Sequence, residues 1–460
     1  MEKFIGRTEE FSVFQKLYDK NAFQMAVIFG RRRIGKTTFV NKFIEKNKCK
    51  SVSFVSTEMT ESELLSRMGK DVLENLVPSL SDKIKFDSFE AIFDCLGEAA
   101  QKEKIIFVID EYPYLAKACP YMNSLLQKYI DHNWKNTNLF FILLGSLISF
   151  MREDVLGSNA PLHGRANLEI KMNPFGYKET GLFIPSYNAE SKAIVYGVTG
   201  GVAKYLEQFD KKLSLDENIE NLFFSRNAFF SDEQIKTIAT GEKSNPAAYN
   251  SMINAIANGK TKYNEIQTAT GMSDISFCLK NLMASEIVER RESSKPYYVI
   301  ADTMLDFYFR YVMPGASLIN SGKGKAYYTK KVRQNLHEFM GKVFENMAKE
   351  YILNNVGTKK VPVFVTDVVE YQNSIKIGKE VKSVEIDILG MDGKKIVLAG
   401  ECKFKSEKFG KEDYELFMEK VNYLPAKDLK LMFFSLSGFT DYVEKTAKGC
   451  TLVSLEQMFR

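Results

Sequence analysis

The stretch that most constrains the fold of this chain is residues 25–38, Met-Ala-Val-Ile-Phe-Gly-Arg-Arg-Arg-Ile-Gly-Lys-Thr-Thr. Its apolar start predicts a buried strand that stops at Gly30. After four further residues come Gly35, Lys36 and Thr37, the spacing of a loop that binds phosphate groups. We therefore expect an α/β domain in which this loop joins a strand to a helix.

Each residue type in the loop suits contact with a nucleotide. Glycines let backbone amides turn toward phosphates. We expect Lys36 to reach the β- and γ-phosphates and Thr37 to ligate Mg²⁺, in front of a helix whose positive end faces the anion. The predicted nucleotide-binding residues of the loop are Gly30, Arg31, Gly35, Lys36, Thr37 and Thr38. The alternative is a glycine-bounded turn with solvated basic side chains.

Composition limits the class of protein without choosing a function. With 460 residues, 45% of them hydrophobic and 26% charged, the chain is expected to be soluble and to form two to four domains. The net charge of +5 permits a nucleic-acid partner but does not require one. Six scattered cysteines and three histidines argue against a zinc site and favour reduced thiols in a cytoplasmic protein. The apolar runs are too short to span a bilayer, so no membrane partner is expected.

Two carboxylates follow a second apolar run. Residues 105–109 predict a buried parallel strand that ends in Asp110 and Glu111. Ligands of open α/β sheets bind at the carboxyl ends of strands, so both carboxylates are expected beside the phosphate loop. Asp110 is expected to hold Mg²⁺ through water, and Glu111 to orient or deprotonate the attacking water. The alternative is a strand that runs into a solvated turn.

Two more polar residues are candidates for the same chemistry. Ser146 ends the apolar run 139–145 and is a candidate for sensing the γ-phosphate or positioning water, or it is a simple strand end. Arg165 follows a flexible stretch and is a candidate for stabilising charge on the leaving phosphate, in cis or on a neighbouring subunit. The alternative is a surface arginine at a turn.

The middle of the chain predicts a winged helix-turn-helix. Helical segments at 249–258, 262–268 and 273–285 precede two short alternating segments, 287–291 and 297–300. The candidate DNA contacts are Asp274, Ser276, Lys280 and Asn281 on the third helix and Arg290, Arg291 and Lys295 on the wing. The surface is only modestly basic, so packing against protein is the alternative. Enrichment in Gly, Ser and Lys at 315–335 predicts a linker.

A second charged constellation lies in the C-terminal part. A helix at 336–353 carries Glu345 in its middle, and predicted strands follow near 361–365, 381–389 and 395–404. Asp387 precedes Glu401 by the distance expected for adjacent strands joined at a hairpin, and alternation places Glu401 and Lys403 on one face. Glu345, Asp387 and Glu401 are expected to bind Mg²⁺ or Mn²⁺, and Lys403 to position or activate a nucleophile. The alternative is an ion pair in a domain that only binds.

The chain as a whole resembles prokaryotic, largely archaeal P-loop ATPases of the AAA+/STAND group with a winged helix and a C-terminal PD-(D/E)XK nuclease-like domain. The matching segments are 4–7, 30–38, 110–111, 145–146, 164–165, 200–201, 205–206, 344–345, 385–387 and 401–403. The resemblance implies that Ile5 and Arg7 pack against adenine, and the alternative is a plain capped helix. Ala203 departs from the family, which usually has proline there.

The expected domains are an ATPase core at 1–174, a helical lid at 175–240, the winged helix at 241–314, the linker at 315–335 and the nuclease-like domain at 336–460. The expected function is an ATPase that binds ATP and Mg²⁺ and controls a metal-dependent nuclease-like domain acting on DNA. The alternative is a nucleotide-dependent switch or transcription regulator that binds DNA or a protein partner without cleaving it. A second copy of the chain is a further candidate partner.

Overall fold

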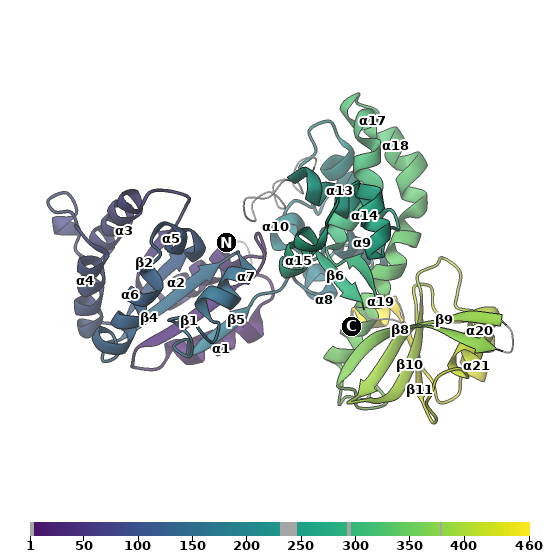
Figure 1. Cartoon of the computed structure of the whole chain (residues 1–460). Helices are drawn as coiled ribbons and strands as arrows, with labels where there is room; N and C mark the ends of the chain where they lie inside the picture. The colour runs from purple at the N-terminus through teal and green to yellow at the C-terminus, as the bar shows by residue number, and fades with distance from the viewer. Residues whose placement is uncertain (1–3, 231–245, 292–295, 378–379) are drawn as a thin grey trace. The chain divides into compact units, whose positions relative to one another are not determined.

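The computed structural model describes residues 4–230, 246–291, 296–377 and 380–460 of the chain. The chain divides into two compact units, residues 1–174 (unit 1) and residues 175–460 (unit 2), each with its own hydrophobic cores (Figure 1). The predicted end of the lid, 231–240, and the predicted wing-tip residue Lys295 lie outside the described residues.

A parallel sheet of five strands forms the centre of unit 1, in the order β2-β3-β4-β1-β5. The strands are β1 (Gln24–Phe29), β2 (Lys50–Val55), β3 (Ile105–Asp110), β4 (Leu139–Gly145) and β5 (Leu168–Lys171). Three of them, β1, β3 and β4, are buried along their whole length, which explains their continuous apolar sequences. The prediction of an α/β fold with a parallel sheet is confirmed. The edge strand β5 was not predicted, because only one of its four residues, Ile170, is buried and the strand lacks an apolar run.

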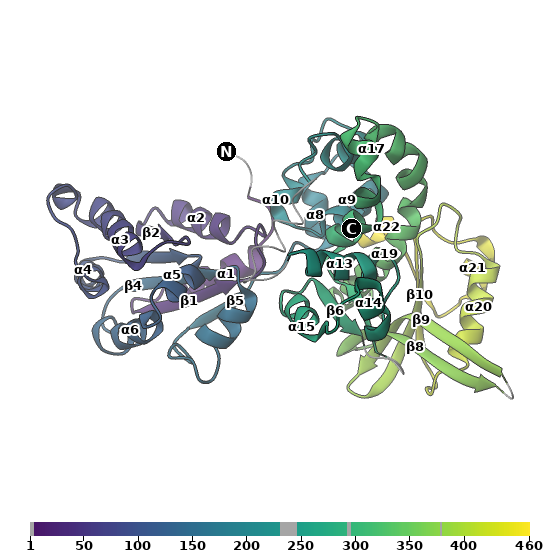
Figure 2. The ribbon, with the colours of Figure 1, turned by 45° about the horizontal axis from the view of Figure 1, so that its top comes forward.

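Helices cover both faces of this sheet (Figures 1 and 2). One face packs against α1 (Thr8–Tyr18) and α2 (Lys36–Asn47), whose phenylalanines Phe14, Phe39 and Phe43 are fully buried. The other face packs against α3 (Glu61–Leu76), α4 (Phe89–Lys102), α5 (Tyr112–Ala118) and α6 (Met122–Lys128). Arg7 occupies the position before the first residue of α1, in a left-handed conformation.

Unit 2 begins with short helices. They are α8 (Tyr177–Phe183), α9 (Ala189–Thr199), α10 (Ala203–Leu206), α11 (Leu215–Ile219) and η4 (Glu220–Phe224). Three more helices and a hairpin follow, α13 (Pro246–Ala257), α14 (Tyr263–Thr270), α15 (Ser276–Ala284), β6 (Val288–Arg291) and β7 (Tyr297–Ile300). The order of elements is that expected from the sequence.

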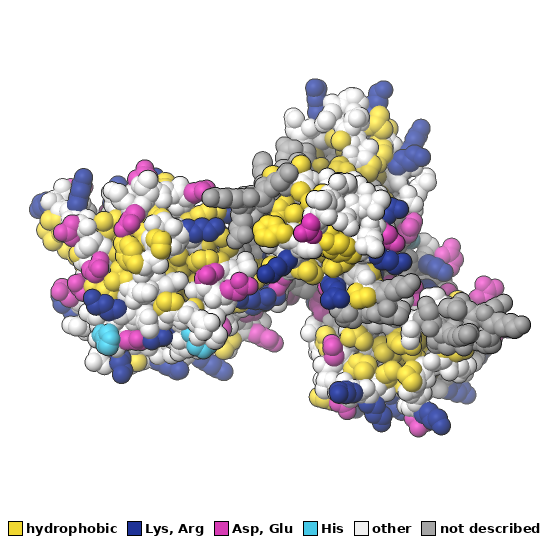
Figure 3. Space-filling view, viewed as in Figure 1, with side chains coloured by type: hydrophobic (Ala, Val, Ile, Leu, Met, Phe, Trp, Pro, Cys, Tyr) yellow, Lys and Arg dark blue, Asp and Glu magenta, His cyan; other side chains and the backbone are white. Residues whose placement is uncertain are grey.

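The prediction of a linker at residues 315–335 is wrong, because the segment is helical. After α16 (Thr303–Phe307) and η5 (Tyr308–Val312) the chain forms η6 (Met313–Gly315), α17 (Ala316–Asn320), α18 (Gly324–Tyr327), η7 (Tyr328–Val332) and η8 (Arg333–Asn335). Tyr328 and Val332 are fully buried, and the Tyr328 hydroxyl donates to Asp216 at 2.6 Å. The lysines that suggested a linker lie on the solvent face, where Figure 3 shows Lys and Arg side chains around α17 and α18.

A mixed sheet of five strands, in the order β12-β11-β10-β9-β8, ends unit 2. Its strands are β8 (Asp367–Ile377), β9 (Glu380–Asp392), β10 (Lys395–Lys403), β11 (Lys430–Ser435) and β12 (Thr451–Ser454). One face packs against α19 (Leu336–Asn354), and the other against α20 (Lys411–Val421) and α21 (Asp441–Thr446), before α22 (Leu455–Met458) ends the chain (Figure 2). The strand predicted at 361–365 is absent from this described segment. Pro362 lacks a backbone donor there, and the chain instead anchors Val361 and Val365 in the core.

Candidate active site

The phosphate loop lies at the carboxyl end of β1. Gly30 and Gly35 have φ angles of 150° and 95°, which favour glycine. A Cβ atom at Gly30 would lie 2.2 Å from the carbonyl oxygen of Met172, so a side chain does not fit there. Lys36 is buried, and its Nζ donates to the carbonyl oxygens of Gly30 at 2.8 Å and Arg31 at 2.9 Å. The predicted loop is therefore formed, with its lysine resting on neutral backbone acceptors.

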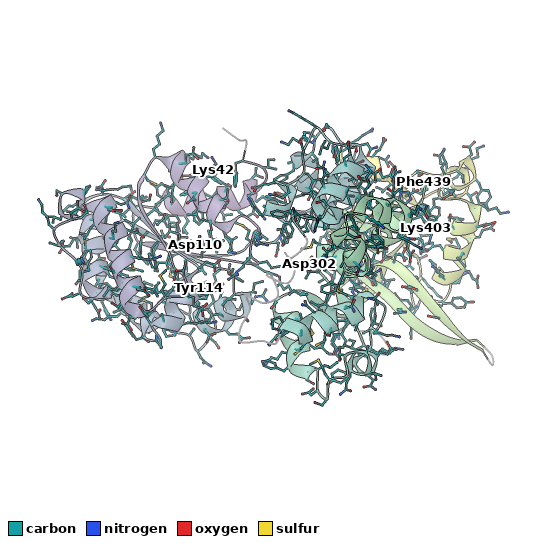
Figure 4. The ribbon with its side chains drawn as sticks, turned by 90° about the horizontal axis from the view of Figure 1, so that it is seen from above. Lys42, Asp110, Tyr114, Asp302, Lys403 and Phe439 are labelled. Carbon is teal, nitrogen blue, oxygen red and sulfur yellow. The ribbon has the colours of Figure 1, made fainter. Side chains whose placement is uncertain are left out.

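Thr37 and Asp110 meet beside this lysine, as the sequence predicts. Thr37 Oγ1 donates to Asp110 Oδ2 at 2.5 Å, and Figure 4 labels Asp110 at the end of its strand. Burial raises the pKa of Asp110, and burial lowers the pKa of Lys36 to about 8 even though Glu111 and Asp110 oppose that shift. The charges of Asp110 and Lys36 are thus only partly offset by their neighbours. A carboxylate and a hydroxyl are oxygen ligands of the kind that Mg²⁺ prefers, so these residues fit a magnesium ion next to bound phosphates.

Glu111 is held by Ser146 at the end of the neighbouring strand β4. Glu111 Oε2 accepts from the Ser146 hydroxyl at 2.6 Å and from its backbone amide at 3.2 Å. Glu111 itself has a φ of 52°, a costly conformation for a residue with a side chain, and such residues cluster at functional sites. The structure therefore brings together the predicted general base and the predicted polar residue of β4.

The remaining predicted nucleotide contacts surround the loop. Thr38 lies in the first turn of α2, whose amide groups face the loop. Ile5 is half-buried, next to Arg7, which is buried. Arg7 Nη2 donates to the carbonyl oxygens of Asn173 at 2.5 Å and Ile34 at 3.4 Å. Arg7 therefore ties the opening turn to the phosphate loop.

Arg165 is not brought to this site. Its Nε and Nη2 pair with the two carboxylate oxygens of Asp131 at 2.9 and 2.7 Å. The adjoining Asn167 exchanges two 2.8 Å hydrogen bonds with Met25, near the amino end of β1. The six residues of β1 span about 20 Å, and the phosphate loop follows their other end. The prediction that Arg165 acts in cis is therefore wrong, whereas an action on a neighbouring subunit stays a prediction.

Two residues that the sequence did not single out complete the site. Arg32 Nε donates to Ser146 Oγ at 3.3 Å, and Arg32 Nη2 donates to the Tyr114 hydroxyl at 2.5 Å. Tyr114 lies on α5, just after Glu111, and is labelled in Figure 4. The three arginines of the loop are alike in sequence, so only the path of the loop distinguishes Arg32 from its neighbours.

The second constellation lies on β9 and β10 of unit 2. The two strands pair antiparallel through the predicted hairpin, so Asp387 and Glu401 lie on neighbouring strands. Asp387 accepts from the backbone amide of Cys402 at 2.9 Å. Glu401, whose side chain is 3% exposed, pairs with Lys403 at 2.7 Å and Lys420 at 3.2 Å. Figure 4 labels Lys403 on this sheet.

The charges of this cluster act on one another. Burial raises the pKa of Asp387 to about 7, with further contributions from Glu401 and Glu345. Burial works to lower the pKa of Lys403, but the carboxylates of Glu401, Asp387 and Asp413 together outweigh burial and raise it. Asp387 is therefore a buried carboxyl group whose neighbours include two further carboxylates.

The predicted second metal site is not assembled in the part of the chain that the structure describes. Glu345 pairs with Lys342 at 2.8 Å, on the same helix α19. Among the described residues, no three His, Cys, Asp or Glu side chains form a group that would hold a metal ion. Each predicted ligand is instead bonded to a basic side chain or a backbone amide, so the residues as arranged do not fit a bound metal.

A further carboxylate, Glu370 of β8, joins the β6–β7 hairpin to this region. It contacts Arg291 of β6 and Lys349 of α19, and it pairs with Lys342 at 2.6 Å. Burial lowers the pKa of Lys349 to about 8, and Arg291 adds to that effect. Sequence reasoning missed Glu370, because it lies in a strand that was predicted a few residues too early. Arg291, a predicted DNA contact, is therefore engaged within unit 2.

The other predicted DNA contacts lie on or before α15. Asp274 accepts from the Ser276 amide at 2.9 Å and from the Tyr263 hydroxyl at 3.0 Å, so it stabilises the start of the helix. Asn281 donates to the Tyr249 hydroxyl at 2.8 Å. Lys280 is exposed.

Comparison with known proteins places these sites in context. Residues 4–209 match a family described as an ATPase domain predominantly from Archaea, and residues 308–414 match a family of archaeal and bacterial proteins of unknown function. An uncharacterized protein of Methanocaldococcus jannaschii is 31% identical over 416 residues, 88% of each chain. An uncharacterized ATP-binding protein of the same organism is 36% identical over 50 residues, which are 11% of this chain and 85% of that protein.

Similarity to solved structures concerns the fold. A Walker-type ATPase of Pyrococcus abyssi matches 67% of this chain and 97% of its own, with a TM-score of 0.51 and 16% identity. The Aeropyrum pernix ORC2 protein, solved as ADPNP-ADP complexes, matches 69% of this chain and 96% of its own, with a TM-score of 0.46 and 12% identity.

No helix in the described ranges of the chain is long and apolar enough to cross a membrane. The assembled phosphate loop and the carboxylates at the carboxyl end of β3 are consistent with the ATPase family that matches this part of the chain. Because its Methanocaldococcus jannaschii relative is 31% identical over 88% of both chains, this chain belongs to that relative's family of P-loop ATPases, with an ATPase domain found predominantly in Archaea.

Proposed function

We propose that unit 1 hydrolyses ATP and that its nucleotide state controls the binding of DNA by unit 2. The observation that carries the first half is the convergence of Lys36, Thr37, Asp110 and Glu111 at the carboxyl end of one parallel sheet. This is the set of groups that phosphoryl transfer to water requires.

Each group has a defined task. Loop amides and Lys36 bind the phosphates, because a phosphate oxygen is a stronger acceptor than the carbonyl oxygens that Lys36 now contacts. Thr37 and Asp110 would hold Mg²⁺, which neutralises phosphate charge when bound. Glu111 orients the attacking water and takes its proton, while Ser146 keeps the carboxylate aligned.

The proposed binding of DNA by unit 2 rests on the order of its elements. We propose that residues 241–314 form a winged helix, with α13 to α15 followed by the β6–β7 hairpin, and that 175–240 serves as the helical lid of the ATPase. Lys280 on α15 and Arg290 on the wing are both exposed and would meet DNA phosphates. Asp274 and Asn281 are engaged within the domain, so they contribute less.

Metal-dependent cleavage of DNA is the second candidate function for residues 336–460. It is favoured by the three carboxyl groups of Asp387, Glu401 and Glu345, which act on one another and whose repulsion a cation would relieve. The ion pairs of Glu345 and Glu401 count against it, so binding without cleavage is the better proposal for this arrangement.

One set of assays tests both halves. Purified wild type should release phosphate from ATP, and Lys36→Ala should lose at least about a hundredfold in rate because the phosphates lose a charged ligand. A labelled duplex should shift in a gel at low salt, with an affinity that differs between ATP and ADP. A protein that releases no phosphate, or binds DNA equally in every nucleotide state, contradicts the corresponding half. Plasmid nicking with Mn²⁺ that Lys403→Ala abolishes would instead favour the nuclease.

A further inference from the structure

Arg32 of the phosphate loop lies at one end of a chain of hydrogen bonds that ends at the catalytic carboxylate. Its Nε donates to Ser146 Oγ at 3.3 Å, and Ser146 Oγ donates to Glu111 Oε2 at 2.6 Å. The Tyr114 hydroxyl accepts from Nη2 of the same guanidinium at 2.5 Å. The guanidinium is therefore fixed between the loop, the end of β4 and α5, on the side of the site where water would attack.

Arg32 lies near Lys36, the lysine proposed to bind the phosphates. It is one of the groups that lower the pKa of Lys36, so the two cations lie close enough to repel each other. An anion bound between two cations relieves such repulsion. Nη1 has no hydrogen-bond partner among the described residues, so one edge of the guanidinium is available for a ligand.

We propose that Arg32 binds the γ-phosphate of ATP held by the same subunit and stabilises the charge that develops on it during hydrolysis. This inference rests on the proposed ATP hydrolysis by unit 1. It gives Arg32 the role that the sequence suggested for Arg165, whose guanidinium is bound to Asp131 at the opposite end of the sheet.

The hydrolysis step shows why a cation is needed at that point. The oxygen of water forms a bond to the γ-phosphorus, while the bond from that phosphorus to the bridging oxygen breaks and its electron pair leaves with ADP. The proton of water passes to Glu111. Negative charge spreads over the γ-phosphate oxygens and the bridging oxygen, and a fixed guanidinium stabilises that charge without having to reorganise.

The hydrogen-bond chain also links the phosphate to the base. A γ-phosphate oxygen that accepts from the free Nη1 leaves the bond from Nε to Ser146 in place. Ser146 therefore keeps its hydroxyl and its backbone amide on Glu111 while the phosphate is bound. Tyr114 holds the other edge of the guanidinium, so it is a positioning residue rather than a ligand of the phosphate.

The test compares two arginines of the same loop. Arg32→Ala should lower kcat for ATP hydrolysis about a hundredfold or more, the size of effect seen when such an arginine is removed. Arg33→Ala removes the same charge from an exposed neighbour and should leave kcat within about threefold. In a Glu111→Gln background, which stops turnover, Arg32→Ala should weaken ATP about tenfold, while ADP, which lacks the γ-phosphate, binds as before.

Other outcomes are equally clear. An Arg32→Ala protein with wild-type kcat overturns the proposal, and so does an equal loss of ATP and ADP affinity, since that would show a general effect on the loop. Arg32→Lys keeps the positive charge but lacks the planar guanidinium, so its kcat should lie between those of the wild type and Arg32→Ala. If Arg32→Ala does not fold, the kcat of the folded lysine variant tests the proposal. If the wild type binds ATP but does not hydrolyse it, the proposed function fails. The ratio of ATP to ADP affinity then still decides the role of Arg32.

Discussion

The ionic groups of the two charged sites have different kinds of partner. In unit 1, Lys36 rests on carbonyl oxygens and Asp110 on a hydroxyl, so among the described residues neither has an oppositely charged partner in direct contact. In unit 2, Glu401 pairs with two lysines, and Glu370 contacts Arg291 and two lysines of α19.

This difference bears on what each site can bind. Neutral partners are exchanged for a charged ligand at little cost, because a ligand of opposite charge adds a Coulomb attraction that a carbonyl oxygen or a hydroxyl lacks. A ligand of the unit 2 cluster has to displace ion pairs that already satisfy buried groups, and leaving one partner unpaired costs several kcal/mol. The first site is thus arranged for a ligand, whereas the second contributes to the stability of its own domain.

The largest expected effect concerns Glu111, the proposed catalytic base of unit 1. Glu111→Gln should lower kcat for ATP hydrolysis about 10²- to 10⁴-fold, because an amide cannot accept the proton of water. Nucleotide affinity should stay close to that of the wild type, since Glu111 contacts Ser146 rather than the loop. Phosphate release and binding of a fluorescent ATP analogue measure the two quantities. As a matched control, Glu103→Gln removes a half-exposed carboxylate that pairs with Lys50, away from the loop, and unchanged activity is expected.

In unit 2 the corresponding change should affect stability. Lys403→Met leaves the buried Glu401 with Lys420 as its one ionic partner, which we expect to cost about 2–3 kcal/mol in the free energy of unfolding. Urea denaturation followed by circular dichroism measures it. The exposed Lys405→Met should change stability by less than about 0.5 kcal/mol. Adding Glu401→Gln to Lys403→Met should restore most of the loss, and a double variant no more stable than the single one would contradict the ion-pair account.

In the β6–β7 hairpin we expect a smaller loss of stability of the same kind. Arg291→Ala removes one of the cations that contact Glu370, and we expect a loss of about 1–2 kcal/mol because Lys349 and Lys342 remain. Arg290→Ala, the exposed neighbour, should be neutral for stability and should weaken DNA binding if the wing contacts DNA. If Arg291→Ala weakens DNA binding without destabilising unit 2, the ion pair with Glu370 does not persist in solution.

The smallest effect is a dependence on pH outside both sites. Burial under the start of α8 raises the pKa of Glu350 to about 7, although the backbone amide of Tyr177 opposes the shift. The folded state then keeps a proton that the unfolded chain has lost, so the stability that Glu350 contributes is full below pH 4.5 and is lost as pH rises through about 7. Glu350→Gln has no such loss and should gain about 1 kcal/mol relative to wild type at pH 8. Denaturation at pH 4.5 and pH 8 measures this difference, and an equal effect at both values would contradict it.

The sequence allowed the site of unit 1 to be predicted almost completely, but allowed much less for unit 2. Gly30, Lys36 and Thr37 lie within eight residues, and Asp110 and Ser146 each end a buried run. Parallel strands bring their carboxyl ends to one edge, so short local patterns are enough to place these groups together. The helical segment at 315–335 was misassigned because its exposed lysines outnumber Tyr328 and Val332, which only the core of unit 2 explains.

What the sequence by itself determined is therefore the parallel α/β sheet with its phosphate loop, and the antiparallel pair that carries Asp387 and Glu401. Only the tertiary structure decided which arginine is linked to Glu111 through Ser146 and which carboxylates of unit 2 are already paired. Arg32 and Arg165 are separated by the full length of β1, and Glu370 contacts Arg291, 79 positions earlier in the chain. The physical reason is how far along the chain each interaction acts. Backbone hydrogen bonding and hydrophobic periodicity act over a few residues, whereas the partner of a long charged side chain depends on how distant elements pack.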